Sequence, residues 1–64
     1  MIVYYKLWDY LRRHGMNKVR LLYCISSPTL AKLSKNQIVT TDTIDKICKY
    51  LDVDPGDIME YVSD

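Results

Sequence analysis

The sequence is poor in the residues and segments that mark membrane, secreted and unstructured proteins. It has only two Gly and two Pro, and it contains no long apolar run. A membrane-spanning helix needs about 20 consecutive, mostly apolar residues, so no transmembrane segment is expected. No charged stretch followed by an apolar one marks a secretory signal. We therefore expect a cytoplasmic domain that does not associate with membranes.

Cysteine and histidine are too scarce for a metal site. A structural zinc site takes four ligands, commonly in closely spaced pairs, whereas Cys24, Cys48 and His14 are the only residues of their types and lie far apart in the sequence. Each cysteine lies in a mostly apolar stretch of sequence, as is typical of buried free thiols in a reducing compartment. We expect no metal and no cofactor.

The sequence patterns of an enzyme are missing as well. No glycine-rich phosphate loop, no nucleophile paired with a base and no close pair of carboxylates can be found. His14 is expected to end a helix, where a partial positive charge suits the helix dipole. So short a chain leaves little room for a ligand cleft of a few hundred Å³. We expect neither catalysis nor a small-molecule ligand.

The 64 residues predict one small domain, 48% hydrophobic, of a size that buries only ~60% of its unfolded surface. Residues 1–5 are rich in β-branched and aromatic side chains, which predicts an extended N-terminal arm. This arm either packs on its own domain or pairs with the arm of a second copy. Residues 6–62 are expected to form a helical core, so the predicted fold class is all-α.

The charges are distributed unevenly along the chain. Residues 1–38 carry seven Lys and Arg but one Asp, a net charge of +6, whereas residues 39–64 carry two Lys and seven acidic residues, a net charge of −5. A basic first half can attract nucleic acid, while an acidic second half opposes non-specific binding. The alternative is an ordinary solvated surface, since the whole chain has a net charge of only +1.

Two helices are predicted in the first third of the chain. The first spans Lys6–His14 and ends at Gly15, a residue typical of the position after a helix. Its buried stripe, at helical spacing, consists of Leu7, Trp8 and Leu11. The second is short, opens at the N-cap residue Asn17 and ends near Tyr23 or Cys24. Its residues available to the core are Val19, Leu21 and Leu22.

Three more helices are predicted after residue 25. The third, residues 26–34, is capped by Ser26 or Ser27, has Pro28 in its first turn and stops near Asn36. The fourth starts at Thr40 or Thr41 and has the clearest amphipathic pattern, formed by Ile44, Ile47, Cys48 and Leu51. The fifth starts with a capping box of Asp54 and Asp57 and contains Ile58, Met59, Tyr61 and Val62.

The order of these stretches resembles the Cro/C1-type, lambda-repressor-like helix-turn-helix regulators, in particular their short single-domain members. The resemblance covers residues 6–62. It rests on Leu7–Leu11 with the His14–Asn17 entry to the second helix, on Ile25–Leu33, on Thr43–Val53 and on Pro55–Met59. It implies a compact five-helix domain of bacterial or mobile-element origin. The segment before Ile25 is shorter than is common in the family, so Tyr23 and Cys24 are expected to make the turn.

The resemblance implies sequence-specific binding of duplex DNA, with the third helix as the recognition helix in the major groove. The residues expected at base edges are Ser26, Ser27, Pro28 and Lys32. Those expected at the DNA backbone are Lys18, Thr29, Lys35 and Asn36. This implies a transcriptional regulator, expected to be a repressor.

A homodimer is expected, because a domain of this size reads short half-sites in pairs. Its predicted interface combines the N-terminal arm with the last helix: Ile2, Tyr4, Ile58, Met59, Tyr61 and Val62. The alternative function is a protein-interaction module on a helix-turn-helix scaffold, of the antirepressor or toxin-partner type. In that case the altered second helix, Pro28 and the arm would form a docking surface.

Overall fold

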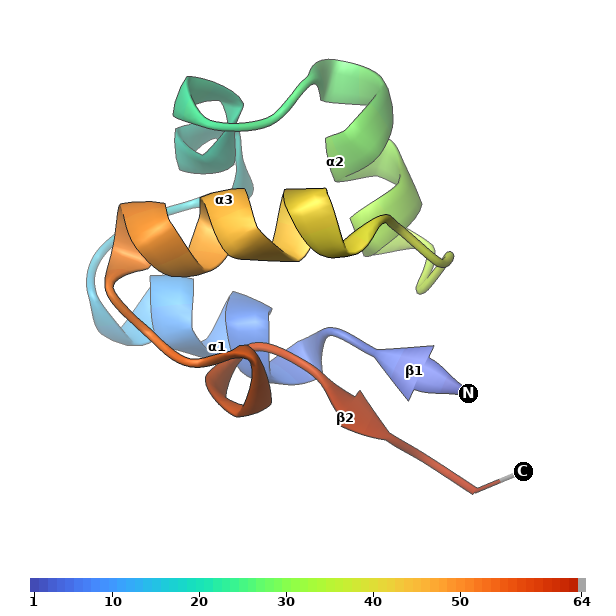
Figure 1. The fold of residues 1–64 in the computed structure, drawn as a ribbon. Coiled ribbons are helices and arrows are strands. Elements are labelled where there is room, and N and C mark those ends of the chain that lie inside the picture. Colours follow the sequence, from blue (N-terminus) through green and yellow to red (C-terminus); the bar gives the residue numbers. More distant parts are fainter. Residues whose placement is uncertain (64) are drawn as a thin grey trace.

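The computed structural model describes residues 1–63 and consists of short helices closed by a small sheet (Figure 1). The elements, in chain order, are β1 (Ile2–Val3), α1 (Tyr5–Arg13), the 3-10 helix η1 (Lys18–Tyr23), α2 (Ser27–Ser34), α3 (Thr41–Leu51), the 3-10 helix η2 (Pro55–Asp57) and β2 (Glu60–Tyr61). In Figure 1, α3 crosses the middle of the molecule, with α1 on one side and η1 and α2 on the other. In the part of the chain that the structure describes, no helix has the length and apolar character needed to cross a bilayer.

The core is built from the apolar stripes that the sequence predicts. Leu7 and Leu11 of α1, Leu33 of α2 and Ile44, Ile47 and Leu51 of α3 are all buried. They meet Tyr4, Leu21 and Ile58 in one cluster, against which Trp8, Leu30, Cys48 and Val53 pack from its edge. The predicted burial of the first and fourth helices is therefore confirmed, except that Trp8 and Cys48 are half-buried.

The three α-helices end alike, with a residue of positive φ one or two positions after the last helical residue. These residues are Gly15 (φ 69), Asn36 (φ 55) and Asp52 (φ 56). In each case the next N–H donates back to a carbonyl of the last turn: Met16 to Leu11 at 2.8 Å, Gln37 to Lys32 at 2.9 Å and Val53 to Cys48 at 3.1 Å. This pattern satisfies helix-end carbonyls, and it confirms the predicted stops at Gly15 and Asn36.

The second helix differs from the prediction in type and in burial. It is a 3-10 helix, which advances about 2.0 Å per residue against about 1.5 Å in an α-helix, so a shortened segment still spans the distance to α2. A 3-10 helix has three residues per turn. With this period, Leu21 is the residue of η1 that points into the core, whereas Val19 and Leu22 are 61% and 44% exposed. The turn that follows is made by Cys24 and Ile25, whose N–H groups both donate to the Leu21 carbonyl at 2.9 Å.

The predicted fifth helix is wrong beyond its first turn. The Asp57 carboxylate accepts from the Asp54 N–H at 3.0 Å, as a capping box requires. The helix that this box starts, however, is the single turn η2, and it ends at Asp57. The chain then extends, and β2 pairs antiparallel with β1, with Ile2 opposite Tyr61 and Val3 opposite Glu60. The fold is therefore a helical domain with a small two-stranded sheet, instead of the predicted all-α domain of five helices. Ile58 is buried at the end of η2.

The same pairing decides between the two interpretations of the N-terminal arm. The arm packs on its own chain, where Val3 and Tyr4 are each 2% exposed. The Val62 N–H donates to the Met1 carbonyl at 2.8 Å, which extends the pairing beyond the two strands. The ends of the described chain therefore close the domain together (Figure 1).

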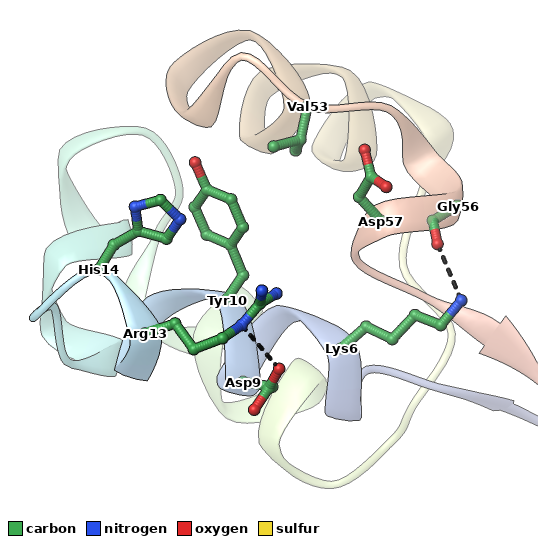
Figure 2. Close-up of a pocket in the computed structure, with 8 residues that line it drawn as sticks. All are labelled: Lys6, Asp9, Tyr10, Arg13, His14, Val53, Gly56 and Asp57. Carbon is green, nitrogen blue, oxygen red and sulfur yellow. Dashed lines mark hydrogen bonds and ion pairs between the residues drawn. The ribbon is translucent and has the colours of Figure 1, made fainter.

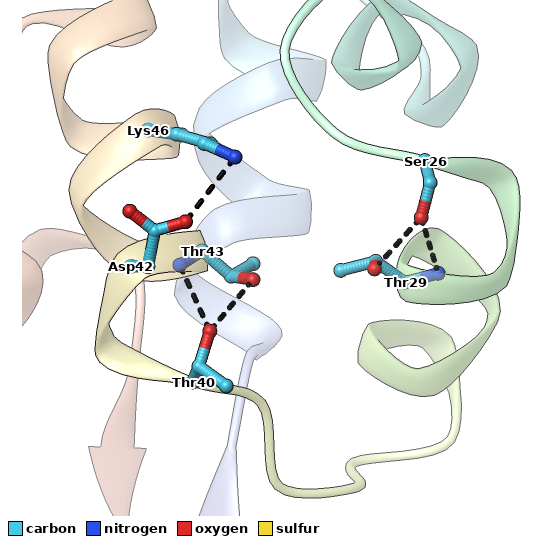
Figure 3. Close-up of polar contacts among 6 residues, drawn as sticks. All are labelled: Ser26, Thr29, Thr40, Asp42, Thr43 and Lys46. Carbon is cyan, nitrogen blue, oxygen red and sulfur yellow. Dashed lines mark hydrogen bonds and ion pairs between the residues drawn. The ribbon is translucent and has the colours of Figure 1, made fainter.

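Ser26, rather than Ser27, caps α2, and this difference predicts unequal effects of two neighbouring substitutions. The Ser26 Oγ accepts from the Thr29 N–H at 3.4 Å (Figure 3). Ser26→Ala is expected to lower the free energy of unfolding by about 1 kcal/mol, because it removes an N-cap. Ser27→Ala, the matched control, should change it by less than about 0.5 kcal/mol. Urea denaturation followed by circular dichroism measures both, and equal losses would contradict the assignment.

Candidate nucleic-acid interface

The elements η1 and α2 form a helix-turn-helix with a tight connection. The Leu21 carbonyl closes the turn by accepting from two successive backbone N–H groups, and the Cys24 Sγ lies 3.4 Å from the same oxygen. Ser26 follows in extended conformation and starts α2, and Pro28 in its first turn needs no N–H partner. This local chemistry fixes where α2 begins relative to η1.

One face of α2 points to solvent while the opposite face is anchored. Leu33 is 0% exposed and holds the helix on the core. All four residues predicted to contact bases are exposed: Ser26, Ser27, Pro28 and Lys32. All four are therefore accessible to solvent, although the Ser26 hydroxyl is also engaged in the cap and lies 2.9 Å from the Thr29 hydroxyl.

The N-termini of α2 and α3 carry matching caps, shown together in Figure 3. Thr40 Oγ1 accepts from the Thr43 N–H at 3.3 Å, as Ser26 Oγ does from Thr29. On α3, Lys46 pairs with Asp42 at 3.2 Å, so this lysine already has a counter-charge. Thr29 is half-buried and committed to its cap, which leaves it a limited part in any contact with a DNA backbone.

Three of the four residues predicted at the DNA backbone, Lys18, Lys35 and Asn36, lie around the C-terminal end of α2, whereas Thr29 lies in its first turn. Lys35 is exposed at the C-terminal cap of α2. The Lys18 ammonium reaches from η1 to within 3.5 Å of the Ser34 hydroxyl, and it lies 4.3 Å from the centre of the Trp8 ring. Sequence reasoning placed Trp8 in the core and missed this contact, because α1 and η1 come together only in the tertiary structure.

Asn36 holds the loop after α2 through its side-chain amide. Its Oδ1 accepts from the Tyr4 N–H and its Nδ2 donates to the Tyr5 hydroxyl, each at 3.3 Å. The Tyr4 hydroxyl donates to the carbonyl of Gln37 at 2.9 Å. Burial raises the pKa of Tyr4, so this hydroxyl stays protonated and able to donate. The two tyrosines were not predicted to reach this loop.

The charges of this region have one sign. No Asp or Glu occurs between Asp9 and Asp42, a segment that includes η1 and α2. Asp9 itself pairs with Arg12 and Arg13 at 2.8 and 2.9 Å. The hydrogen bond from Arg12 is the main cause that lowers the pKa of Asp9. The surface of the helix-turn-helix is therefore basic, as polyanion binding requires.

The predicted dimer residues divide into two groups. Tyr4 and Ile58 are 2% and 0% exposed in the chain's own core, so they are not available to a second copy of the folded domain. Tyr61 and Val62 are 71% and 42% exposed at β2. Ile2 and Met59 are half-buried beside them.

A separate groove of about 480 Å³ lies between α1 and η2 (Figure 2). Several of its charged groups already have partners within the chain. The Lys6 ammonium donates to the Gly56 carbonyl at 3.1 Å, and Asp9 pairs with Arg13. The His14 ring stacks on Tyr10 with centroids 4.1 Å apart. Among the residues that line this groove, no nucleophilic side chain is hydrogen-bonded to a general base.

The two cysteines are free and half-buried. Burial raises the pKa of both the Cys24 and the Cys48 thiol. Within residues 1–63, no three of His, Cys, Asp and Glu stand close enough to hold a metal ion together.

Comparisons with known proteins agree with this geometry. The family model of the Cro/C1-type HTH DNA-binding domain matches residues 6–64. The crystal structure of the transcriptional regulator VanUg superposes with a TM-score of 0.92 at 38% identity, over 98% of this chain and 87% of that one. A comparison with curated proteins found no match. The chain belongs to the Cro/C1-type family of helix-turn-helix DNA-binding domains.

Proposed function

We propose that this domain is a dimeric transcriptional repressor that binds a short operator sequence with α2 in the major groove. The observation that carries the proposal is the surface of α2, where Ser27, Pro28 and Lys32 are exposed opposite the buried anchor Leu33. The major groove of B-DNA admits an α-helix, and in helix-turn-helix proteins the N-terminal residues of the second helix contact base edges. The relative VanUg is named a transcriptional regulator.

The exposed residues of α2 fit distinct groups on base edges. Lys32 can donate to O6 or N7 of guanine, and the Ser26 and Ser27 hydroxyls can donate or accept. The Pro28 ring offers an apolar surface to a thymine methyl group. These contacts would carry sequence preference, whereas contacts to phosphate carry none.

Lys18 and Lys35 are proposed to bind phosphates beside the C-terminal end of α2, and Thr29, in the first turn of α2, to lie near the backbone. Asn36 lies beside Lys35, but its amide is engaged by Tyr4 and Tyr5. We propose that Asn36 acts by holding the loop that carries Lys35, and not by a side-chain contact to DNA.

The proposed dimer uses the exposed side chains of Tyr61 and Val62, with the half-buried Ile2 and Met59 beside them. The outer edge of β2 lies at the end of a two-stranded sheet, and strand addition by a second copy would extend it. Sedimentation at micromolar concentration tests this interface, with Tyr61→Asp as the variant expected to be monomeric. A strict monomer at all concentrations, with and without DNA, would exclude the dimer.

In-vitro selection of bound duplexes from a random pool tests the function and gives the preferred sequence. Binding to the selected duplex should weaken steeply between about 50 and about 200 mM salt, because lysines release counterions from the phosphates they neutralise. Each neutralised phosphate contributes about 0.9 to the slope of log affinity against log salt. The absence of any enriched duplex and of salt-dependent binding at low salt would refute the proposal.

A second candidate function is protein docking through η1, which one observation favours. Val19, Leu22, Tyr23 and Tyr50 form an exposed apolar patch, in which the Tyr23 and Tyr50 rings stack with centroids 6.3 Å apart. Lys49 lines the adjoining hollow, so the patch suits a partner with an apolar centre and an acidic rim. If an acidic protein co-purifies in stoichiometric amount with the wild type and with Lys32→Ala, but not with Tyr23→Ser, that result would support docking.

A further inference from the structure

The ammonium group of Lys18 lies over an aromatic ring. It lies 4.3 Å from the centroid of Trp8 and 3.5 Å from Ser34 Oγ, at the outer limit of a hydrogen bond. Three elements meet at this point, because Trp8 belongs to α1, Lys18 to η1 and Ser34 to α2. An ammonium this close to the face of an indole is attracted by the ring quadrupole.

The ring is a fixed support for this ammonium. Trp8 is half-buried and packs against the core cluster, so its position is set by α1 and the core. An exposed lysine otherwise samples many rotamers and loses that freedom when it binds. The contact with Trp8 therefore holds the charge in place before any ligand arrives.

The ammonium has no carboxylate partner within residues 1–63. The acidic side chains with ion pairs there are Asp9, with two arginines, and Asp42, with Lys46. Near the Lys18 ammonium are a serine hydroxyl, which can donate to an oxyanion, and the end of α2, where Lys35 follows Ser34 in the chain. A positive charge beside a hydroxyl donor is the chemistry that binds phosphate.

We propose that Lys18 and Ser34 form a binding site for one DNA phosphate at the end of α2, and that Trp8 is the positioning residue that holds Lys18 in this site. This inference rests on the proposed function, since it names the contact that fixes α2 on the DNA backbone. Trp8 touches no DNA itself. It sets the site's affinity for phosphate and leaves the choice of bases to α2.

A double-mutant cycle on the full chain tests the positioning role, with a short mixed-sequence duplex as the probe. Lys18→Met keeps the length of the side chain but removes the charge, and it should lower the salt slope by about 0.9 per bound chain. Trp8→Leu should weaken binding about two- to fivefold, the usual size of an exposed cation–π contact. In the Lys18→Met background, Trp8→Leu should have no further effect. Trp8→Phe, which restores a ring face, should recover part of the loss.

Fluorescence gives a readout that does not depend on the cycle, because Trp8 is the only tryptophan. The emission of the free protein should change in Lys18→Met, in which the ammonium over the indole is gone. Duplex binding should change the emission of the wild type, and Lys18→Met should bind weakly without that change. If Trp8→Leu fails to fold, Trp8→Phe and these emission measurements still decide the question.

The two proposals fail in different ways. If the wild-type protein binds no duplex, both the proposed function and the proposed phosphate site are refuted. A wild type that binds with the expected salt dependence, but loses the same affinity on Trp8→Leu with and without Lys18, refutes only the positioning role. Unchanged emission in free Lys18→Met would also contradict the contact.

Discussion

Tyr4→Ala is expected to leave much of the domain unfolded at 25 °C. Tyr4 is 2% exposed in the core, and its hydroxyl and backbone N–H hold Gln37 and Asn36 of the loop after α2. Truncating a large buried aromatic residue costs about 3–5 kcal/mol. A domain of this length has a total stability of about 3–10 kcal/mol at the usual value per residue. The free energy of unfolding, from urea titration by circular dichroism, measures the effect.

Tyr5→Ala is the matched control for this substitution. Tyr5 is adjacent and also a tyrosine, but it is 60% exposed and contributes one hydrogen bond, from Asn36. Its loss should cost less than about 1 kcal/mol. Tyr4→Phe keeps the ring and removes only the hydroxyl, so it should cost about 0.5–1.5 kcal/mol. Similar losses for Tyr4→Ala and Tyr5→Ala would show that the arm does not belong to the core.

Lys32→Ala is expected to relax the sequence preference of DNA binding by about 1–3 kcal/mol at one base pair. Lys32 is exposed one helical turn after Pro28, on the α2 face that we propose enters the major groove. Removing its ammonium leaves the helix intact, since alanine is the best helix former. Fluorescence anisotropy with the selected duplex and its single-base variants measures the discrimination at each position.

Lys35→Ala is the control that separates base reading from attraction to phosphate. Lys35 is exposed just after α2, where we propose a backbone contact. Its loss should weaken binding to every duplex alike and lower the salt slope by about 1. If both lysine variants weakened all duplexes equally, Lys32 would be a phosphate contact, and base reading would have to be assigned to other residues.

The starts of α2 and α3 follow from local sequence. Ser26 or Ser27 with Pro28 predicts the start of α2, and Thr40 or Thr41 predicts that of α3, because capping is chemistry between residues three apart. The structure selects Ser26 and Thr40. The exposed and buried faces of α2 follow from helical periodicity. Asn36 was predicted to stop α2, since it tolerates positive φ.

What the sequence by itself determined is thus the α-helices, their caps and the faces they bury. Tertiary structure decided three further features: η1 as a 3-10 helix with only Leu21 buried, the pairing of Ile2 with Tyr61, and the position of Trp8 beneath Lys18. The physical reason is the range of the interactions. Caps and periodicity act within one or two turns, whereas strand pairing, the span from α1 to α2 and the contact of an ammonium with a ring join segments that only the packed core brings together.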